Sequence, residues 1–204
     1  MKQGAFIVLE GGDGAGKSTI ADFLRNAFPT ALMTRAGESP FGKHLRELLI
    51  SDAASLATSE SQFLLSFAMH LDHARNVVAP ALEKGKHVIS DRFDASNFAY
   101  QVRGNNAPHL ESLFWDIRSK MLGEVAPDLY IFLDVSPEVG IARAKSTGKA
   151  LDAFERRPSA FHTNVREGYL EFLKSVPHTI IDATRPLEEV QANVLALVKK
   201  HVRL

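Results

Sequence analysis

Eight residues near the N-terminus have the types and the spacing of a phosphate-binding loop. The run Gly11-Gly12-Asp13-Gly14-Ala15-Gly16-Lys17-Ser18 fits the pattern G-x-x-x-x-G-K-[ST] at every fixed position, and Thr19 follows it. Glycines let backbone N–H groups turn inward around a polyphosphate, and a helix that begins there adds its N-terminal dipole. Lys17 would then bridge the β- and γ-phosphates, and Ser18 would offer its hydroxyl to Mg²⁺.

The residues on both sides of this loop predict the elements that position it. Phe6 to Leu9 form an apolar run that is typical of a strand buried on both faces. After the loop, Ile20, Phe23, Leu24 and Ala27 recur with a helical period. A glycine-rich turn that matches the pattern by chance would need neither element, so we interpret the run as a strand, a phosphate loop and a helix.

The rest of the chain alternates between predicted strands and helices. We expect further strands at 31–35, 87–90, 129–133 and 178–181, and helices at 41–50, 59–82, 95–102, 108–122, 137–144, 160–173 and 187–201. Ser59 and Gln62 have the spacing of a capping box that would open the long helix. The alternation predicts an α/β fold, a three-layer sandwich with a five-stranded parallel sheet and helices on both faces.

Four polar residues, Arg35, Asp91, Arg92 and Asp134, lie at the ends of predicted strands. In open parallel sheets ligands bind at the carboxyl ends of the strands, so these side chains should lie beside the phosphate loop. For Asp134 we favour a structural role at the strand end.

Composition limits the class of protein. The 204 residues suit a single domain, 1–204, and equal numbers of basic and acidic residues (24 each) give no global field that would attract nucleic acid or a membrane. Zero cysteines exclude disulfides, and the eight histidines form no spaced metal set. No export signal or 18-residue apolar run occurs, so we expect a soluble, cytoplasmic protein.

Four motifs resemble the thymidylate kinase family, P-loop enzymes that move the γ-phosphoryl group of ATP onto dTMP. They are Glu10 to Thr19, Thr34-Arg35, Asp91 to Gln101 and Pro127 to Arg143, and the tail Ile181 to Val190 is similar as well. The stretch Asp-Arg-Phe…Ser…Ala-Tyr-Gln is the most specific of these. The resemblance implies a P-loop NTPase fold, ATP as co-substrate, Mg²⁺ and a homodimer packed through long helices, for which the helix at 59–82 is a candidate.

The resemblance also implies roles for the residues at the strand ends. Arg35 and Arg92 would clamp the phosphate of the acceptor nucleotide, because a guanidinium offers two parallel donors to phosphate oxygens. Asp91 would bind Mg²⁺ through water or orient the acceptor. The alternative for Asp91 and Arg92 is an ordinary ion pair at a strand end.

Around the sugar and the base, the resemblance assigns four further residues. Asp13 would accept a hydrogen bond from the 3′-hydroxyl group, and Tyr100 would close the sugar side against a 2′-hydroxyl group. Ser96 and Gln101 would face the base. Tyr100 could instead be an ordinary core residue, and Gln101 a solvated helix residue.

The chain departs from the family pattern after the second strand. The family usually has Arg-Glu-Pro there, whereas this chain has Arg35-Ala36-Gly37. Gly37 could supply unusual backbone angles in place of the proline, and Glu38 could replace the missing acid.

A second departure lies in the polar segment 145–158, which we interpret as a mobile flap. The family often has Asp-Arg-Phe-Glu in this lid, with a transition-state arginine, whereas Ala153 stands here in its place. Arg156 and Arg157 lie three and four residues after Ala153, so on a helix they would share its face and are candidates to replace the missing arginine. The alternative is a solvated charge pair. Other possible donors are Arg143, which we also assign to the ATP phosphates, Lys145 and Lys149.

The third departure is the base pocket. The family's stacking aromatic and its arginine, four residues later, correspond to Ser66 and His70. Phe67 is adjacent to the stacking position but points about 100° away on a regular helix. We therefore expect dTMP as the default acceptor, with dUMP or a 5-substituted dUMP used relatively better than usual. A His70 with an ordinary pKa would make base recognition depend on pH between about 6 and 7.

Other function classes have distinct requirements. A deoxynucleoside kinase would bind an acceptor without a phosphate, for which Arg35 and Arg92 would be superfluous. A guanine-specific GTPase would need an Asn-Lys-x-Asp loop, which the sequence lacks. A non-catalytic relative that only binds nucleotide is an alternative because of Ala153.

Overall fold

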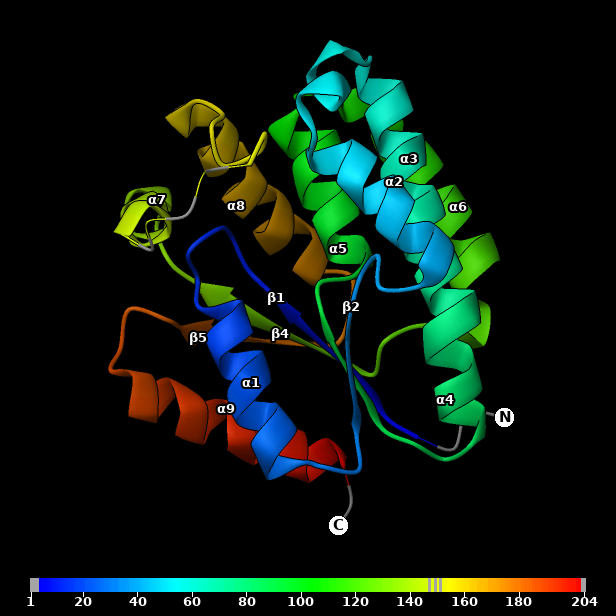
Figure 1. The fold of residues 1–204 in the computed structure, drawn as a ribbon, viewed down its shortest axis with the longest axis vertical. Helices are drawn as coiled ribbons and strands as arrows, with labels where there is room; N and C mark the ends of the chain where they lie inside the picture. Colours follow the sequence, from blue (N-terminus) through cyan, green and yellow to red (C-terminus); the bar gives the residue numbers. More distant parts are fainter. Residues whose placement is uncertain (1–3, 147, 149, 151, 203–204) are drawn as a thin grey trace.

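A five-stranded parallel sheet forms the centre of the molecule (Figure 1). The computed structural model describes residues 4–146, 148, 150 and 152–202. Its strands are β1 (Phe6–Glu10), β2 (Leu32–Arg35), β3 (Val88–Asp91), β4 (Leu129–Asp134) and β5 (His178–Asp182), in the order β2-β3-β1-β4-β5. β1 therefore lies in the middle, and the phosphate loop begins at its carboxyl end. The predicted α/β fold and its five strands are confirmed.

The helices are α1 (Lys17–Ala27), α2 (Pro40–Ile50), α3 (Ser59–His73), α4 (Ala79–Glu83), α5 (Asp94–Asn97), α6 (Glu111–Leu122), α7 (Pro137–Ser146), α8 (Ser159–Leu173) and α9 (Leu187–His201). Short 3₁₀ turns are η1 (Asp52–Leu56), η4 (Pro108–Leu110) and η5 (Gly123–Val125), and η2 (Ala74–Val78) and η3 (Phe98–Gly104) are π-helical.

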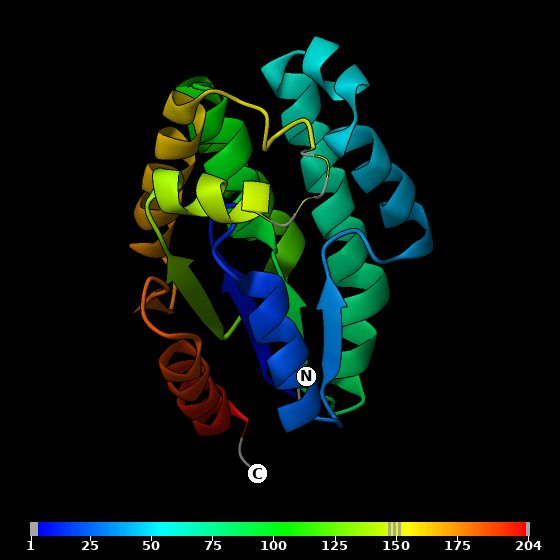
Figure 2. The same cartoon turned by 60° about the vertical axis from the view of Figure 1, so that its left-hand side comes forward.

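Alternating side chains on the central strands separate two cores. Ile7 and Leu9 belong to the core that includes residues of α1 and α9. Phe6 and Val8 belong to the other core, to which α3, α6 and α8 contribute many aromatic residues. Figures 1 and 2 show α1 and α9 on one side of the sheet and the larger group of helices on the other. Strands buried on both faces explain why the sequence runs that predicted them are continuously apolar.

The predicted helix at 59–82 is divided by a π-helical stretch. Pro80, near the start of α4, cannot donate a backbone hydrogen bond to the preceding turn, and η2 lies directly before α4. The predicted capping box is shifted as well. Thr58 is the N-cap and accepts a hydrogen bond from the Ser61 N–H (3.2 Å), whereas the Gln62 amide donates to the Ala57 carbonyl (3.1 Å).

The segment 145–158, which we interpreted from its polar sequence as a flap, has packing contacts in its described part. α7 extends to Ser146, and Phe154 packs edge-on against Tyr100 (5.4 Å between ring centroids) and stacks on Phe161 (6.2 Å). The backbone N–H of Ala153 donates to the Ile50 carbonyl (3.4 Å). This segment therefore covers the space between α2 and η3.

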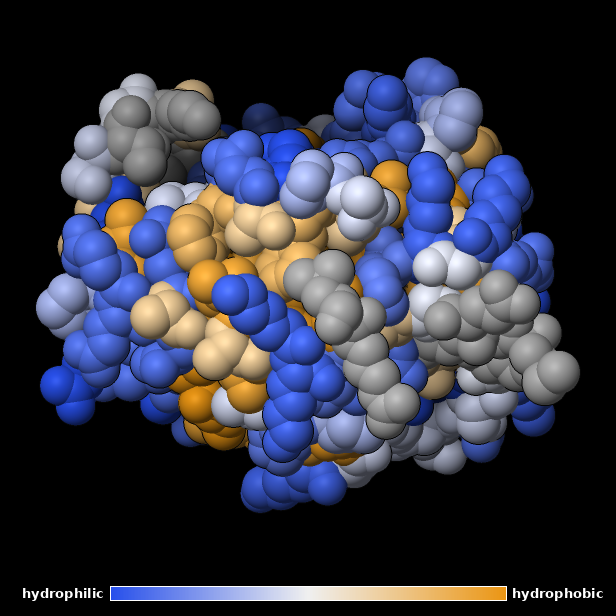
Figure 3. Space-filling view, turned by 90° about the horizontal axis from the view of Figure 1, so that it is seen from below, coloured by the Kyte–Doolittle hydropathy of each residue, from blue (hydrophilic) through white to orange (hydrophobic). Residues whose placement is uncertain are grey.

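Figure 3 views the molecule from below in Figure 1, where apolar side chains lie centrally within a hydrophilic rim. Large exposed apolar side chains include Phe41 and Leu48 of α2 and Leu64 of α3. Among the described residues, the helices are all too short or too polar to cross a bilayer.

Candidate active site

The phosphate loop takes its shape from close backbone contacts. Gly14 has a positive φ of 70°, and a Cβ atom there would lie 1.9 Å from the carbonyl oxygen of Gly140 in α7. A Cβ atom on Gly140 would in turn lie 2.3 Å from the carbonyl oxygen of Asp13. Both positions therefore require glycine, and the loop is packed directly against the start of α7.

Lys17 folds back over its own loop. Its Nζ donates to the carbonyl oxygens of Gly11 (2.9 Å) and Gly12 (2.8 Å). Burial, together with the positive charge of Arg92, lowers the pKa of the Lys17 ammonium to about 8. Ser18 and Thr19 lie exposed at the beginning of α1, as a site for a phosphate and its cation requires.

Arg92 is the centre of the hydrogen-bond network. It follows β3 with a positive φ of 71°, which turns its side chain toward the phosphate loop. Its guanidinium donates to the Gly11 carbonyl (3.0 Å), to Asp13 Oδ1 (2.8 Å) and to the Tyr169 hydroxyl (2.8 Å). Weaker contacts reach Ser96 and Tyr100 (3.3 Å each). This network is more extensive than an isolated ion pair at a strand end.

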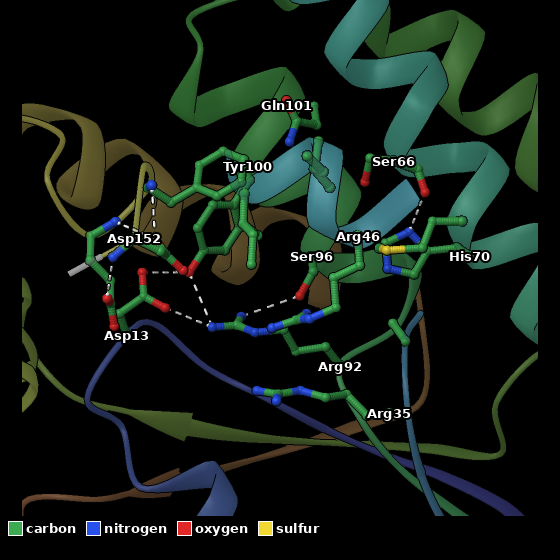
Figure 4. A pocket seen from close by; sticks show the side chains of 16 residues that line it. Asp13, Arg35, Arg46, Ser66, His70, Arg92, Ser96, Tyr100, Gln101 and Asp152 are labelled. Atoms are coloured by element: carbon green, nitrogen blue, oxygen red, sulfur yellow. Dashed lines mark hydrogen bonds and ion pairs between the residues drawn. The ribbon is translucent and has the colours of Figure 1, made fainter. Parts of the chain in front are cut away.

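Asp13 and Tyr100 complete a ring of hydrogen bonds with Arg92. The Tyr100 hydroxyl donates to Asp13 Oδ2 (3.0 Å), while Oδ1 of the same carboxylate accepts from Arg92. Burial would raise the pKa of Asp13, but the charges of Arg92 and Lys17 outweigh it and lower that pKa below its ordinary value. Asp13 is therefore an ionised acceptor beside the pocket. Figure 4 shows these three side chains together.

Glu10 lies behind this ring and was not identified from the sequence as a site residue. It is fully buried, and its carboxylate accepts hydrogen bonds from the Phe93 N–H and the Ser96 hydroxyl (2.8 Å each). Burial raises the pKa of Glu10 to about 7, against the opposing charge of Arg92. The Ser96 hydroxyl is thus engaged with Glu10 on the inner side of the pocket wall.

A pocket of about 150 Å³ opens beside the network (Figure 4). Three arginines line it, Arg35 from β2, Arg46 from α2 and Arg92. Arg35 approaches Asp91 (3.5 Å), yet Arg35 Nε and Asp91 Oδ1 are both buried without a hydrogen-bond partner in the described chain. The other lining residues are Asp13, Ala36, Leu49, Ile50, Ser66, Met69, His70, Ser96, Tyr100, Gln101, Asp152, Phe154 and Glu155.

The unpartnered oxygen of Asp91 is a test of whether the site suits Mg²⁺. Hard carboxylate and hydroxyl oxygens are the ligands that Mg²⁺ prefers, and it usually retains several water ligands. Asp91 Oδ1 and the exposed Ser18 fit such an ion. No cluster of three or more acidic or histidine ligands occurs within residues 4–146, 148, 150 and 152–202, so a site made of protein ligands alone is not present there.

Arg46 was missed in the sequence, although a signal existed. Gly42 and Leu49 are the buried positions of α2, and Arg46 lies on the same face, four and three residues away from them. A charged residue that interrupts a buried helical stripe indicates a polar site. Burial, with the charges of Arg35 and Arg92, lowers the pKa of Arg46. Three neighbouring guanidinium groups therefore create a strong demand for an anion.

Ser66 and His70 both line the far end of the pocket, as expected. The His70 Nδ1 lies 2.8 Å from the Ser66 carbonyl oxygen, so Nδ1 carries the hydrogen and Nε2 is an acceptor. Burial lowers the pKa of His70 to about 4. The expectation of a His70 titration between pH 6 and 7 is therefore wrong, because the desolvated ring stays neutral there.

The assignment of Phe67 to the acceptor site is also wrong. Its ring packs between those of Phe63 and Phe114, with a distance of 5.6 Å between ring centroids in each case, and it belongs to the aromatic core. Gln101, in contrast, lines the pocket and is only 1% exposed, so it is not a solvated helix residue.

Comparison with known proteins decides the family of this chain. The family model described as thymidylate kinase matches residues 9–194. The chain belongs to the thymidylate kinase family. It is 39% identical over 211 aligned positions to a thymidylate kinase of Caulobacter vibrioides, covering all of both chains. It is 37% identical over 201 positions to that of Hahella chejuensis, covering 95% of each chain.

The connection after β2, where the sequence departs from the expected family pattern, is held by several hydrogen bonds. Gly37 has a positive φ of 86°, as expected. Glu38 Oε2 accepts hydrogen bonds from the Thr34 hydroxyl and from the Arg35 N–H (3.1 Å each). The Thr34 hydroxyl also contacts His73 Nε2 of α3 (2.9 Å). Glu38 thus stabilises the backbone that carries Arg35.

None of the three described arginines assigned to the lid or to the ATP phosphates reaches the phosphate loop in this structure. Arg156 forms an exposed ion pair with Asp52, and Arg157 donates to Asn105 Oδ1 (2.7 Å). Arg143 donates to the Ala183 carbonyl (2.9 Å), beyond β5, so its assignment to the ATP phosphates is not supported by its position.

The remaining predicted donors are less informative. Lys145 lies exposed near the end of α7, and Lys149 lies outside the described residues. Asp134 has the structural role that we expected, because both of its oxygens accept hydrogen bonds from Arg166 of α8 (2.7 Å each).

Proposed function

We propose that this chain transfers the γ-phosphoryl group of ATP to the 5′-phosphate of dTMP, forming dTDP and ADP. The observation that carries the proposal is the convergence of Arg35, Arg46 and Arg92 on one pocket beside a phosphate loop. A kinase that joins two anionic substrates must neutralise both, and this site has separate donors for each. The thymidylate kinase relatives support the choice of substrates.

Lys17 acts on the transferred group in this proposal. Its Nζ is bonded to carbonyls of its own loop, and it can exchange them for phosphate oxygens of ATP without leaving the loop. An oxygen of the acceptor phosphate forms a bond to the γ-phosphorus, while the bond from that phosphorus to the ADP oxygen breaks. Backbone N–H groups of residues 11–19 and the Lys17 ammonium stabilise the charge that develops.

The proposed Mg²⁺ ion would be bound by Ser18 and, through water or directly, by Asp91. When bound, the ion neutralises charge on the polyphosphate. Asp91 also approaches Arg35, so it orients one guanidinium of the acceptor clamp.

Asp13, Arg92 and Tyr100 favour a deoxyribose in the acceptor site. The ionised Asp13 carboxylate is a hydrogen-bond acceptor for the 3′-hydroxyl group, and the Tyr100 ring occupies the adjacent wall. A 2′-hydroxyl group would need an additional partner in a wall whose polar atoms already bond one another. The result is discrimination against ribonucleotides.

We also propose that two copies associate through α2 and α3. Phe41, Leu48 and Leu64 expose 58%, 49% and 53% of their surface in the single chain, and contact with a second copy would remove this apolar surface from water. Sedimentation velocity should give a dimer mass, and charged substitutions of Leu48 and Leu64 should shift it to the monomer.

The deciding experiment is a coupled assay for ADP release with ATP, Mg²⁺ and a panel of dTMP, dUMP, dCMP and dGMP. We expect turnover with dTMP at the highest kcat/KM and a loss of about 10³-fold or more in the Lys17→Ala variant. ADP release that no deoxynucleoside monophosphate stimulates would contradict the proposal and would favour a nucleotide-binding relative without transfer activity.

A further inference from the structure

A continuous row of polar side chains connects the lid with the base end of the pocket. Arg157 Nη2 donates to Asn105 Oδ1 (2.7 Å), and Asn105 Nδ2 donates to Gln101 Oε1 (2.9 Å). Asn105 Nδ2 also contacts Gln62 Oε1 (3.2 Å), and Gln62 Nε2 donates to the Ala57 carbonyl (3.1 Å). These contacts lie outside the phosphate chemistry described above.

The two ends of this row determine the orientation of every amide within it. A guanidinium can only donate, so Asn105 must turn its oxygen toward Arg157 and its NH₂ group toward Gln101. A backbone carbonyl can only accept, so Gln62 must turn its NH₂ group toward Ala57 and its oxygen toward Asn105. Both requirements agree, although side-chain amides are otherwise difficult to orient.

Gln101 is therefore left with its NH₂ group toward the pocket. Figure 4 shows the nitrogen of this amide on the pocket side and the oxygen turned away. Because Gln101 is only 1% exposed, a mismatched group opposite this donor would not be compensated by bulk water.

We infer that Arg157 is a positioning residue for base selection: through Asn105 it keeps Gln101 as a hydrogen-bond donor toward the base. This inference rests on the proposed function and specifies the acceptor. The base must present an acceptor such as the 4-carbonyl oxygen of thymine or uracil. A 4-amino group, as in cytosine, would place two donors against each other and be rejected.

Asn105→Asp tests the orientation directly. A carboxylate can accept from Arg157 but cannot donate to Gln101, so the Gln101 amide must reverse and present its oxygen to the pocket. The probes are dUMP and dCMP, which share the same sugar and phosphate. We expect the ratio of kcat/KM for dUMP over dCMP to fall at least about tenfold. Gln62→Ala, which removes the other Asn105 contact, should leave the ratio near that of the wild type.

The lid is tested separately with three variants. Arg157→Ala removes the charged donor to Asn105 (2.7 Å) and leaves only the longer Gln62 contact (3.2 Å) to orient the amide, so the same ratio should fall. Arg157→Lys supplies another group that only donates and should restore it in part. Arg156→Ala is the matched control, because its guanidinium pairs with Asp52 instead. It should leave the dUMP to dCMP ratio at the wild-type value.

The outcomes separate this inference from the proposed function. A folded Asn105→Asp variant with an unchanged ratio of kcat/KM for dUMP over dCMP would overturn the inference. An equal loss of kcat/KM with both substrates in Arg157→Ala would also overturn it and would assign Arg157 to phosphate transfer. Wild-type protein that uses no deoxynucleoside monophosphate would overturn the proposed function first. If Asn105→Asp does not fold, judged by its thermal transition, the Arg157 series decides alone.

Discussion

Lys17 is buried, and burial lowers its pKa to about 8. Its ammonium donates to two carbonyls of its own loop. Lys17→Met should therefore change charge stabilisation much more than packing. We expect kcat to fall about 10³-fold or more with an unchanged circular dichroism spectrum. Lys199→Met, an exposed position on α9, is the control for the loss of one lysine. Near-normal turnover in Lys17→Met would remove this residue from the mechanism.

His70 gives a prediction about pH. Because burial lowers its pKa to about 4, the ring stays neutral at every pH used in an ordinary kinase assay. The KM for dTMP should therefore show no step between pH 6 and 7 that depends on His70. Measuring KM at half-unit intervals in the wild type and in His70→Asn checks this. A step near pH 6.5 that His70→Asn abolishes would show that the ring is solvated.

At the scale of single residues, the sequence predicted the site residues that belong to a recognisable motif. Lys17 and Arg92 were identified because phosphate chemistry constrains residue types and spacing, whereas Asp13 and Tyr100 were assigned through the resemblance to the thymidylate kinase family. Glu10 and Arg46 were missed, because what makes them part of the site is burial, which depends on elements distant in the sequence. Phe67 was assigned wrongly for the same reason.

The connection between β2 and α2 carries Arg35 on a backbone that Glu38 stabilises. Glu38→Ala should loosen this connection and raise the KM for dTMP about tenfold, while the KM for ATP changes little, because the phosphate loop is a separate element. Glu47→Ala is a matched control, since Glu47 is an exposed residue of the following helix that faces His44. Equal effects on both substrates would show that Glu38 has a general role in folding.

Elements with a clear period were predicted closely, and irregular ones were not. Each of the five strands ends within a residue or so of its predicted bounds, since continuous apolar runs between polar residues leave little freedom. The π-helical turns η2 and η3 were read as α-helix. A single widened turn changes the spacing of apolar residues by one, which a short sequence window does not resolve.

For the whole molecule, burial of Glu10 links stability to pH. Its pKa is raised to about 7, so between about 4.5 and 7 the folded chain retains a proton that the unfolded chain has released. The free energy of unfolding should therefore decrease through this window as pH rises, on the order of 1 kcal/mol per pH unit. Glu10→Gln should not show this decrease.

Urea unfolding of both proteins at pH 5 and pH 8 checks this expectation. The unfolding free energy of Glu10→Gln relative to the wild type should be larger at pH 8 than at pH 5. Parallel changes in the two proteins would show that another group is responsible. We also expect kcat of Glu10→Gln to be lower than that of the wild type at both pH values, because Glu10 lies behind Arg92 and Ser96.

The overall architecture was predictable because alternation of strands and helices permits few topologies. The position of the lid was not predictable, since the segment is mostly polar and the partners of Phe154, Tyr100 and Phe161, belong to other elements. Contacts of this kind become visible only when the chain is folded.

The contact between Gly14 and Gly140 also restricts how this protein can evolve. A methyl group on either residue would overlap the backbone of the opposite segment, so a substitution at one position cannot be compensated by a later substitution at the other. Positions far apart in the gene are therefore fixed together, although neither has a side chain that could do chemistry. In a saturation library selected for growth on kinase activity, both codons should remain glycine while the exposed positions around them drift.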